Sequence, residues 1–197
     1  FPDAVKVAKA RLALNPESFA IKTSLAHALV GVGQLDEAIS LYKEVLSQNA
    51  DRPKVWVALG HALKAKGDTT DAVNAYEKAV EYANDYGDAY WSLANTKTYK
   101  FSDNMLSQMC KQVEASSIKL DDKIHICFAL GKGFEDKGQA DKAFAYYDQG
   151  NKLKHSTLQF DISRTEKALD AQQQAFTADS FSSKQGCQAP DPIFIVG

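Results

Sequence analysis

A spacing of 34 residues between similar side chains is the feature that most constrains how this chain folds. The residues that recur at this spacing are Leu25 and Leu59, Ala26 and Gly60, Gly33 and Gly67, Ala38 and Ala72, and Tyr42 and Tyr76. Within each period, apolar and small residues follow helical spacing in two runs, which are broken at "GVGQLDE" and "AKGDTTD". A unit of two short helices cannot bury its apolar face alone, so successive units stack. The sequence therefore predicts an all-α array of stacked helix pairs.

The residue types at the repeated positions have a packing reason. Small residues such as Ala26 and Gly60 let the two helices of a unit approach closely, while Tyr42 and Tyr76 fill space against the next unit. A glycine after the first helix suits a left-handed cap. This pattern and period resemble the tetratricopeptide repeat. The resemblance implies a right-handed solenoid of about four helix pairs, with a leading single helix and a C-terminal capping helix.

Extending the register along the chain predicts the boundaries of its parts. The array covers 1–157, with a partial repeat at 1–18, full repeats at 19–52, 53–86 and 124–157, and an irregular repeat at 87–123. The irregular repeat lacks the glycine and the small residue, and its second helix is predicted from Asp103 to Ser116 with Asp103 as N-cap. A capping helix is expected at 158–183. Residues 184–197 are expected to form a linker and a first strand, "PIFIVG".

Two stretches resemble bacterial tetratricopeptide-repeat sulfotransferases. The last repeat carries a family-like series, namely Leu130, Gly131, Lys132, Asp136, Ala143, Phe144, Gly150 and Asn151. Pro192–Gly197 resembles the first strand of the sulfotransferase domain, which runs into a phosphosulfate-binding loop. The resemblance implies that the chain is the N-terminal part of such an enzyme and that Gly197 is the first residue of the loop.

That resemblance also implies what the larger protein does. The larger protein would transfer a sulfuryl group from phosphoadenosine phosphosulfate to a hydroxyl or amine. The loop would bind the phosphate groups of this cofactor, because backbone N–H groups that follow a buried strand can donate hydrogen bonds to phosphate oxygens. No catalytic constellation is found in the present residues, so no transferase activity and no cofactor binding are expected of this chain. Two alternatives remain open: a repeat array fused to another P-loop enzyme such as a kinase, or a stand-alone adaptor.

Composition and charge narrow the classes of partner. The formal net charge is −2 and the pI is about 6.1, which gives no general attraction to nucleic acid or anionic membranes. No window is long and apolar enough to span a bilayer. The three cysteines show no C-x-x-C spacing, which favours a reducing, cytoplasmic location over a disulfide framework. The expected partner is a protein or peptide, with no nucleic acid and no membrane.

Metal and nucleophile candidates are weak. His27 and His61 lie 34 residues apart and could face each other on neighbouring helices, but no carboxylate or Cys joins them at ligand spacing. We therefore expect no metal site and interpret the two histidines as polar residues of a groove. Cys127 lies on an apolar helical face and is interpreted as core.

The predicted binding surface is the concave face formed by the first helix of each repeat. The repeat register, transferred by position, assigns to it a set of nine residues: Lys54, Val57, His61, Lys64, Trp91, Asn95, Tyr99, Phe128 and Lys132. Ala20, Thr23, His27, Asp88 and His125 occupy the same positions in neighbouring helices. Trp91, Tyr99 and Phe128 are predicted as aromatic anchors for a peptide with apolar side chains and modest negative charge. The alternative left open is that Trp91 and Phe128 pack between adjacent first helices.

Overall fold

The computed structural model describes residues 2–158 and 161–176 of the chain. These residues form ten α-helices and no strand, which confirms the all-α fold class. The chain divides into two units, Phe1–Thr157 and Leu158–Gly197. The sequence prediction of stacked helix pairs concerns the first of these units.

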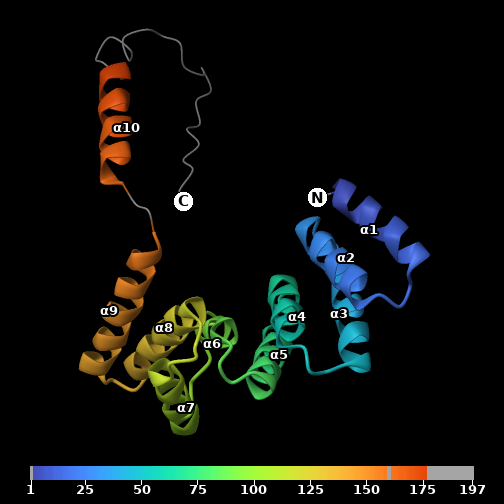
Figure 1. The fold of residues 1–197 in the computed structure, drawn as a ribbon, viewed down its shortest axis with the longest axis horizontal. Helices are drawn as coiled ribbons and strands as arrows, with labels where there is room; N and C mark the ends of the chain where they lie inside the picture. The colour runs from blue at the N-terminus through green and yellow to red at the C-terminus, as the bar shows by residue number, and fades with distance from the viewer. Residues whose placement is uncertain (1, 159–160, 177–197) are drawn as a thin grey trace, which may run out of the picture. The chain divides into compact units, whose positions relative to one another are not determined.

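The first unit consists of a leading helix followed by eight more helices (Figure 1). They are α1 (Pro2–Leu14), α2 (Phe19–Gly31), α3 (Leu35–Gln48), α4 (Pro53–Lys66), α5 (Thr69–Tyr82), α6 (Gly87–Ala94), α7 (Asp103–Glu114), α8 (Leu120–Asp136) and α9 (Ala140–Thr157). Neighbours in sequence pack together in α2–α3, α4–α5 and α8–α9. Alternate helices also meet, since α2 contacts α4, α4 contacts α6 and α6 contacts α8. First helices therefore line up side by side, as the repeat requires.

The turns inside the repeats confirm the predicted caps. Gly33, Gly67 and Gly138 each follow a first helix with φ of 77°, 102° and 70°. A side chain at these positions would be strained, because L-residues rarely adopt this left-handed conformation. Pro53 begins α4, where its missing N–H leaves no intrahelical bond unmade.

The core follows the repeated positions. Ala26, Ala38, Ala72 and Tyr76 have no exposed surface, and Tyr42 is only 1% exposed. These residues belong to one contiguous cluster of buried side chains, which runs from α2 to α8. Burial of each large side chain in this cluster stabilises the fold by about 1.5–3 kcal/mol.

The irregular repeat departs from the prediction. Helix α6 ends after eight residues at Ala94, and Lys97 takes a left-handed φ of 66° in the turn that follows. Phe101, only 4% exposed, then enters the core. The predicted N-cap, Asp103, is wrong: the side chain of Ser102 accepts the hydrogen bond from the Met105 amide, at 3.2 Å. Helix α7 packs against α8 and ends at Glu114, two residues before the predicted Ser116.

The last pair begins earlier than the repeat boundary at 124 indicated. Helix α8 begins at Leu120 and runs for 17 residues to Asp136. Its Gly131 faces the ring of Tyr147 on α9, which repeats the packing of Gly60 against Tyr76. Phe144 of α9 is 73% exposed, so the apolar surface of the array continues onto this last helix.

The second unit contains α10 (Ile162–Ala175), which lies within the range predicted for a capping helix. The carboxylate of Asp161 caps it by accepting from the Ser163 amide at 3.0 Å. The capping role itself stays a prediction. The predicted linker and strand at 184–197, including Phe194 and Gly197, lie outside the described residues. Among the described helices, none combines the length and apolar content needed to cross a bilayer.

Candidate functional site

A groove of about 400 Å³ runs along the first helices α2 and α4 to the start of α6. We call it the α2–α4 groove; its walls are Thr23, His27, Lys54, Val55, Val57, Ala58, His61, Tyr86 and Asp88. Three residues of the predicted peptide site, Lys54, Val57 and His61, therefore line one depression. Thr23, His27 and Asp88, assigned to the same helix positions by the repeat register, line it with them.

The two groove histidines each pack against a tyrosine of their own repeat. The His27 ring meets Tyr42 edge-on with centroids 5.6 Å apart, and the His61 ring meets Tyr76 in the same way at 5.5 Å. Nδ1 of His61 and the hydroxyl of Tyr76 share a hydrogen bond of 2.9 Å. Within residues 2–158 and 161–176, no group of three or more His, Cys, Asp or Glu side chains is arranged to hold a metal ion. Both histidines are exposed in the groove, and each ring contacts a buried tyrosine of the core.

Burial lowers the pKa of His61 below its ordinary value of 6.5. The nearby carboxylate of Asp88 opposes this effect by raising the pKa, while the charge of Lys64 adds to it. Burial also raises the pKa of Tyr76 to about 12, so its hydroxyl stays protonated at neutral pH. The groove floor at His61 therefore offers a neutral imidazole with hydrogen-bonding capacity.

Trp91 and Phe128 do not stand free in a groove. The ring of Trp91 stacks on His125 with centroids 6.2 Å apart and tilts against Phe128 at 5.6 Å. Both residues are half-buried. Since Trp91 is on α6 and the other two are on α8, this cluster holds two adjacent first helices together. The packing alternative raised from the sequence is therefore present in the structure.

The position of Tyr99 also differs from the prediction. Tyr99 lies beyond the end of α6, because that helix stops at Ala94. Its hydroxyl donates to Glu77 of α5 at 2.8 Å, and its ring packs edge-on against Phe101. Asn95 caps α6 and its carbonyl accepts from Nζ of Lys64 at 3.0 Å. The assignment of Tyr99 to the face of a first helix is therefore wrong.

The predicted groove lysines differ in whether they are paired. Lys132 forms an ion pair with Asp136, and the same carboxylate accepts from Lys100 at 2.6 Å. Lys64 is engaged by the Asn95 carbonyl. Lys54 is exposed, and its ammonium group has no ion-pair or hydrogen-bond partner among the described residues. Of the three lysines, Lys54 is the one available to a ligand.

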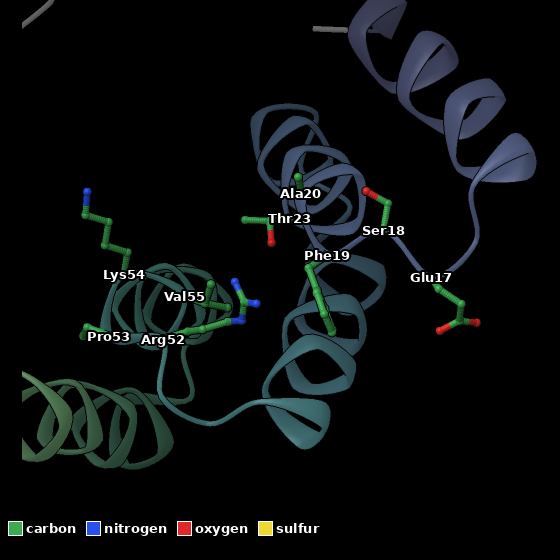
Figure 2. A pocket seen from close by; sticks show the side chains of 9 residues that line it. All are labelled: Glu17, Ser18, Phe19, Ala20, Thr23, Arg52, Pro53, Lys54 and Val55. Carbon is green, nitrogen blue, oxygen red and sulfur yellow. The ribbon is translucent and has the colours of Figure 1, made fainter.

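A second depression of about 850 Å³ adjoins the groove where α2 and α4 begin. We call it the junction pocket; it is lined by Glu17, Ser18, Phe19, Ala20, Thr23, Arg52, Pro53, Lys54 and Val55 (Figure 2). Thr23, Lys54 and Val55 line both depressions. The guanidinium of Arg52 lies over the Phe19 ring, 4.6 Å from its centroid. The pocket therefore joins an aromatic surface to a cation.

The sequence prediction missed Phe19 and Arg52, although a signal for them exists. Phe19 stands where the next two repeats have Pro53 and Gly87, and Arg52 stands where the next repeat has Tyr86. The shared repeat pattern does not specify the residues at these positions. A search for the differences between repeats, rather than for their shared residues, would have found this pair.

Gly197, the residue expected to begin a phosphosulfate-binding loop, is not among the described residues. The groove and the junction pocket are the two depressions of the first unit that contain residues of the predicted peptide site. Both lie on first helices of the array.

Comparisons with known proteins bear on the repeat and on the fold. The tetratricopeptide repeat family model matches residues 1–66 and again residues 29–96. The chain is similar to the crystal structure of MamA, with a TM-score of 0.57 and 18% identity over 79% of this chain and 90% of that one. It is also similar to BtubC (BKLC) from P. vanneervenii, with a TM-score of 0.59 and 15% identity over 81% of this chain and 75% of that one.

A third similar structure is a kinesin light chain from Podosopora anserina with nearly identical TPR-like repeats. Its TM-score is 0.54, with 17% identity over 81% of this chain and 89% of that one. At such identities the likeness concerns the fold. A comparison with curated proteins finds no match.

Proposed function

We propose that this tetratricopeptide-repeat array is a scaffold that binds a segment of a partner protein in the α2–α4 groove. The observation that supports this most directly is the alignment of Thr23, His27, Lys54, Val57 and His61, from two successive first helices, along one depression. Repeat arrays offer extended surfaces of this kind to peptides. The family match and the fold of the similar structures agree with a binding role.

The groove combines polar and apolar groups at close quarters. Val57 and Ala58 supply apolar wall, while the His61 imidazole and the Thr23 hydroxyl supply hydrogen-bonding groups. The ammonium group of Lys54 is free to pair with a carboxylate. This chemistry suits a short peptide with apolar side chains and modest negative charge.

The test is selection of a phage-displayed library of random 12-residue peptides on the purified chain. The best peptides are then titrated by fluorescence anisotropy against the wild type and the variants Lys54→Glu and His61→Ala. Reversing the charge at Lys54 replaces attraction by repulsion, so we expect affinity to fall by about tenfold or more. Removing the His61 ring should also weaken binding.

The matched control is Lys43→Glu. Lys43 is exposed on the second helix α3 and lines neither depression, so the same charge change there should leave affinity within about twofold. Failure to select any peptide on the wild type would contradict the proposed function. Equal losses in Lys54→Glu and Lys43→Glu would contradict the location of the site.

We also propose, more specifically, that the array is part of a sulfotransferase and that the larger protein uses phosphoadenosine phosphosulfate. The support is the family-like series from Leu130 to Asn151 and the stretch Pro192–Gly197. The peptide bound in the groove would then be part of the acceptor substrate, or would bring that substrate to the enzyme.

The coding sequence that follows Gly197 tests this second proposal directly. A continuation of the form x-Pro-Arg-Ser-Gly-Thr would support a sulfotransferase, and Gly-Lys-Thr would support another P-loop enzyme such as a kinase. A stop codon at this point would contradict both the sulfotransferase and the alternative P-loop enzyme. Calorimetric titration of the present chain with the cofactor should give no binding.

A further inference from the structure

Two cationic residues, Arg52 and Lys54, line the junction pocket without carboxylate partners among the described residues. Arg52 makes no ion pair within the described part of the chain, and its Nε is buried with no hydrogen-bond partner. Lys54, two residues further along the chain, is likewise unpaired among the described residues. The one acidic residue in the lining, Glu17, has an 85% exposed side chain and lies 3.7 Å from Lys22. The pocket therefore carries an uncompensated positive charge.

The apolar part of the pocket lies directly against these cations. Phe19 and Arg52 face each other from α2 and the start of α4 (Figure 2), and Val55 and Ala20 extend the apolar wall. The π face of the Phe19 ring attracts the guanidinium and holds it in place. Arg52 is thereby preorganised, while the N–H donors on its two Nη atoms have no partner among the described residues.

The pairing of Phe19 with Arg52 does not recur at the next junction of the array. The equivalent junction between the next two repeats has Pro53 and Tyr86 in place of Phe19 and Arg52, and there the Tyr86 hydroxyl donates to Asp88 at 3.3 Å. At the second junction the Tyr86 hydroxyl has a hydrogen-bond partner within the array. At the first junction, Nε of Arg52 is buried without a hydrogen-bond partner. The second junction therefore serves as an internal comparison for the first.

We propose that the junction pocket takes a large apolar side chain of the bound peptide and that Arg52 pairs with a Glu or Asp next to it. This inference rests on the proposed peptide-binding function and adds a sequence preference to it. The pocket shares Thr23, Lys54 and Val55 with the α2–α4 groove, so one peptide reaches both depressions. A volume of about 850 Å³ accommodates a Leu, Met or Phe side chain together with neighbouring backbone.

The positive charge of the junction pocket should favour acidic over basic residues in the peptide. An acidic residue of the peptide gains a charge-assisted hydrogen bond from Arg52, which is worth more than a neutral one. A basic residue at that place would meet the like charge of Arg52. The preference should therefore weaken as salt rises, because exposed charges are screened.

The experiment selects the same phage-displayed 12-residue library in parallel on the wild type, Arg52→Gln and Ala20→Trp. Arg52→Gln keeps a polar side chain but removes the charge, and Ala20→Trp fills the pocket from an exposed position of α2. Peptides selected on the wild type should be enriched in Glu or Asp within two residues of a large apolar residue. This enrichment should disappear on Arg52→Gln.

The best wild-type peptide is then titrated by fluorescence anisotropy, beside a version with Gln in place of its acidic residue. We expect the acidic peptide to bind about tenfold more tightly than the Gln peptide to the wild type. Arg52→Gln should bind the two equally, Arg52→Lys should restore part of the difference, and Ala20→Trp should weaken both. Circular dichroism confirms that each variant keeps its helices.

The outcomes separate this inference from the proposed function. Selection of peptides that lose affinity for His61→Ala but not for Arg52→Gln or Ala20→Trp would overturn the inference and leave the groove as the binding site. Failure to select peptides on the wild type would overturn both. An unchanged preference for acidic peptides in Arg52→Gln would also overturn the role of Arg52.

Discussion

A methyl group built on Gly60 would lie 2.3 Å from Cε1 of Tyr76. The Tyr76 ring is fully buried and holds a hydrogen bond to His61, so it cannot move aside at low cost. Gly60 is on α4 and Tyr76 is on α5, and their contact sets how closely the two helices of the second repeat approach. The same contact recurs between Gly131 and Tyr147, at 2.5 Å.

Replacement of Gly60 by Ala should therefore destabilise the array. Overpacking of a filled core costs about 1–3 kcal/mol, and the better helix propensity of Ala returns about 1 kcal/mol. We expect a net loss of up to about 2 kcal/mol in the free energy of unfolding, measured by urea denaturation.

The Tyr76→Leu background provides the control for this prediction. With the ring removed, Gly60→Ala should be neutral or stabilising, because only the gain in helix propensity remains. A loss of the same size in both backgrounds would show that the Gly60–Tyr76 contact is not the cause.

Contacts of this kind could be predicted from the sequence because they are periodic. Positions 26, 60 and 131 hold small residues, and positions 42, 76 and 147 hold tyrosines 16 residues later. The repeat register therefore predicted the core of the regular repeats, the left-handed glycines at Gly33 and Gly67, and the first helices that form the groove.

What is not periodic could not be predicted in this way. Helix α6 ends at Ala94, and the loop after it brings Phe101 into the core near Gly133 and Leu106 of other helices. Similarly, the pairing of Lys132 with Asp136 and Lys100 depends on how the loop after α6 returns to α8. Such contacts join segments whose relative positions the repeat does not specify.

The pKa of His61 should respond in opposite directions to two charge changes. Asp88→Asn removes the carboxylate that raises it and should lower the pKa further, whereas Lys64→Gln removes a cation that lowers it and should raise the pKa. NMR titration of the His61 ring proton measures both. Shifts in the same direction would contradict the electrostatic account of the groove floor.

The same pKa predicts how stability depends on pH. The unfolded chain binds a proton at His61 more readily than the folded chain does, since the folded pKa lies below 6.5. The contribution of His61 is therefore present above pH 6.5 and is lost as pH falls through the folded pKa. A His61→Gln variant should lose less stability than the wild type as the pH falls from 7 to 5.

The pKa of Asp136 is lowered, whereas the pKa of an acid that is buried without a partner is raised. Burial alone would raise its pKa, but hydrogen bonds from Lys100 and Lys132 and their charges outweigh that effect and lower it. Its stabilising contribution is present above about pH 3.8, its ordinary value, and is lost as pH falls through the lowered pKa.

Replacement of Asp136 by Asn tests this cluster. The substitution keeps the size but removes the charge that holds the loop after α6 to α8, and we expect a loss of about 1–2 kcal/mol at pH 7 in urea denaturation. Asp85→Asn, at an exposed position with no ion pair among the described residues, should change stability by less than about 0.5 kcal/mol. Equal effects of the two variants would show that the cluster adds nothing.

Trp91 should matter for stability more than for peptide binding. Its ring packs against His125 and Phe128 of α8, so Trp91→Ala would remove contacts that join two adjacent first helices. A half-buried aromatic ring lost in this way should cost about 2–3 kcal/mol, less than the cost of deleting a fully buried one.

Peptide affinity should respond differently to the same change. Trp91 lines neither the α2–α4 groove nor the junction pocket, so peptides selected on the wild type should bind Trp91→Ala within about twofold at a temperature where the variant is folded. The comparison is with Lys54→Glu, which should weaken binding without comparable loss of stability. A loss of affinity in Trp91→Ala with little change in unfolding would instead identify Trp91 as a ligand contact and extend the binding surface to α6 and α8.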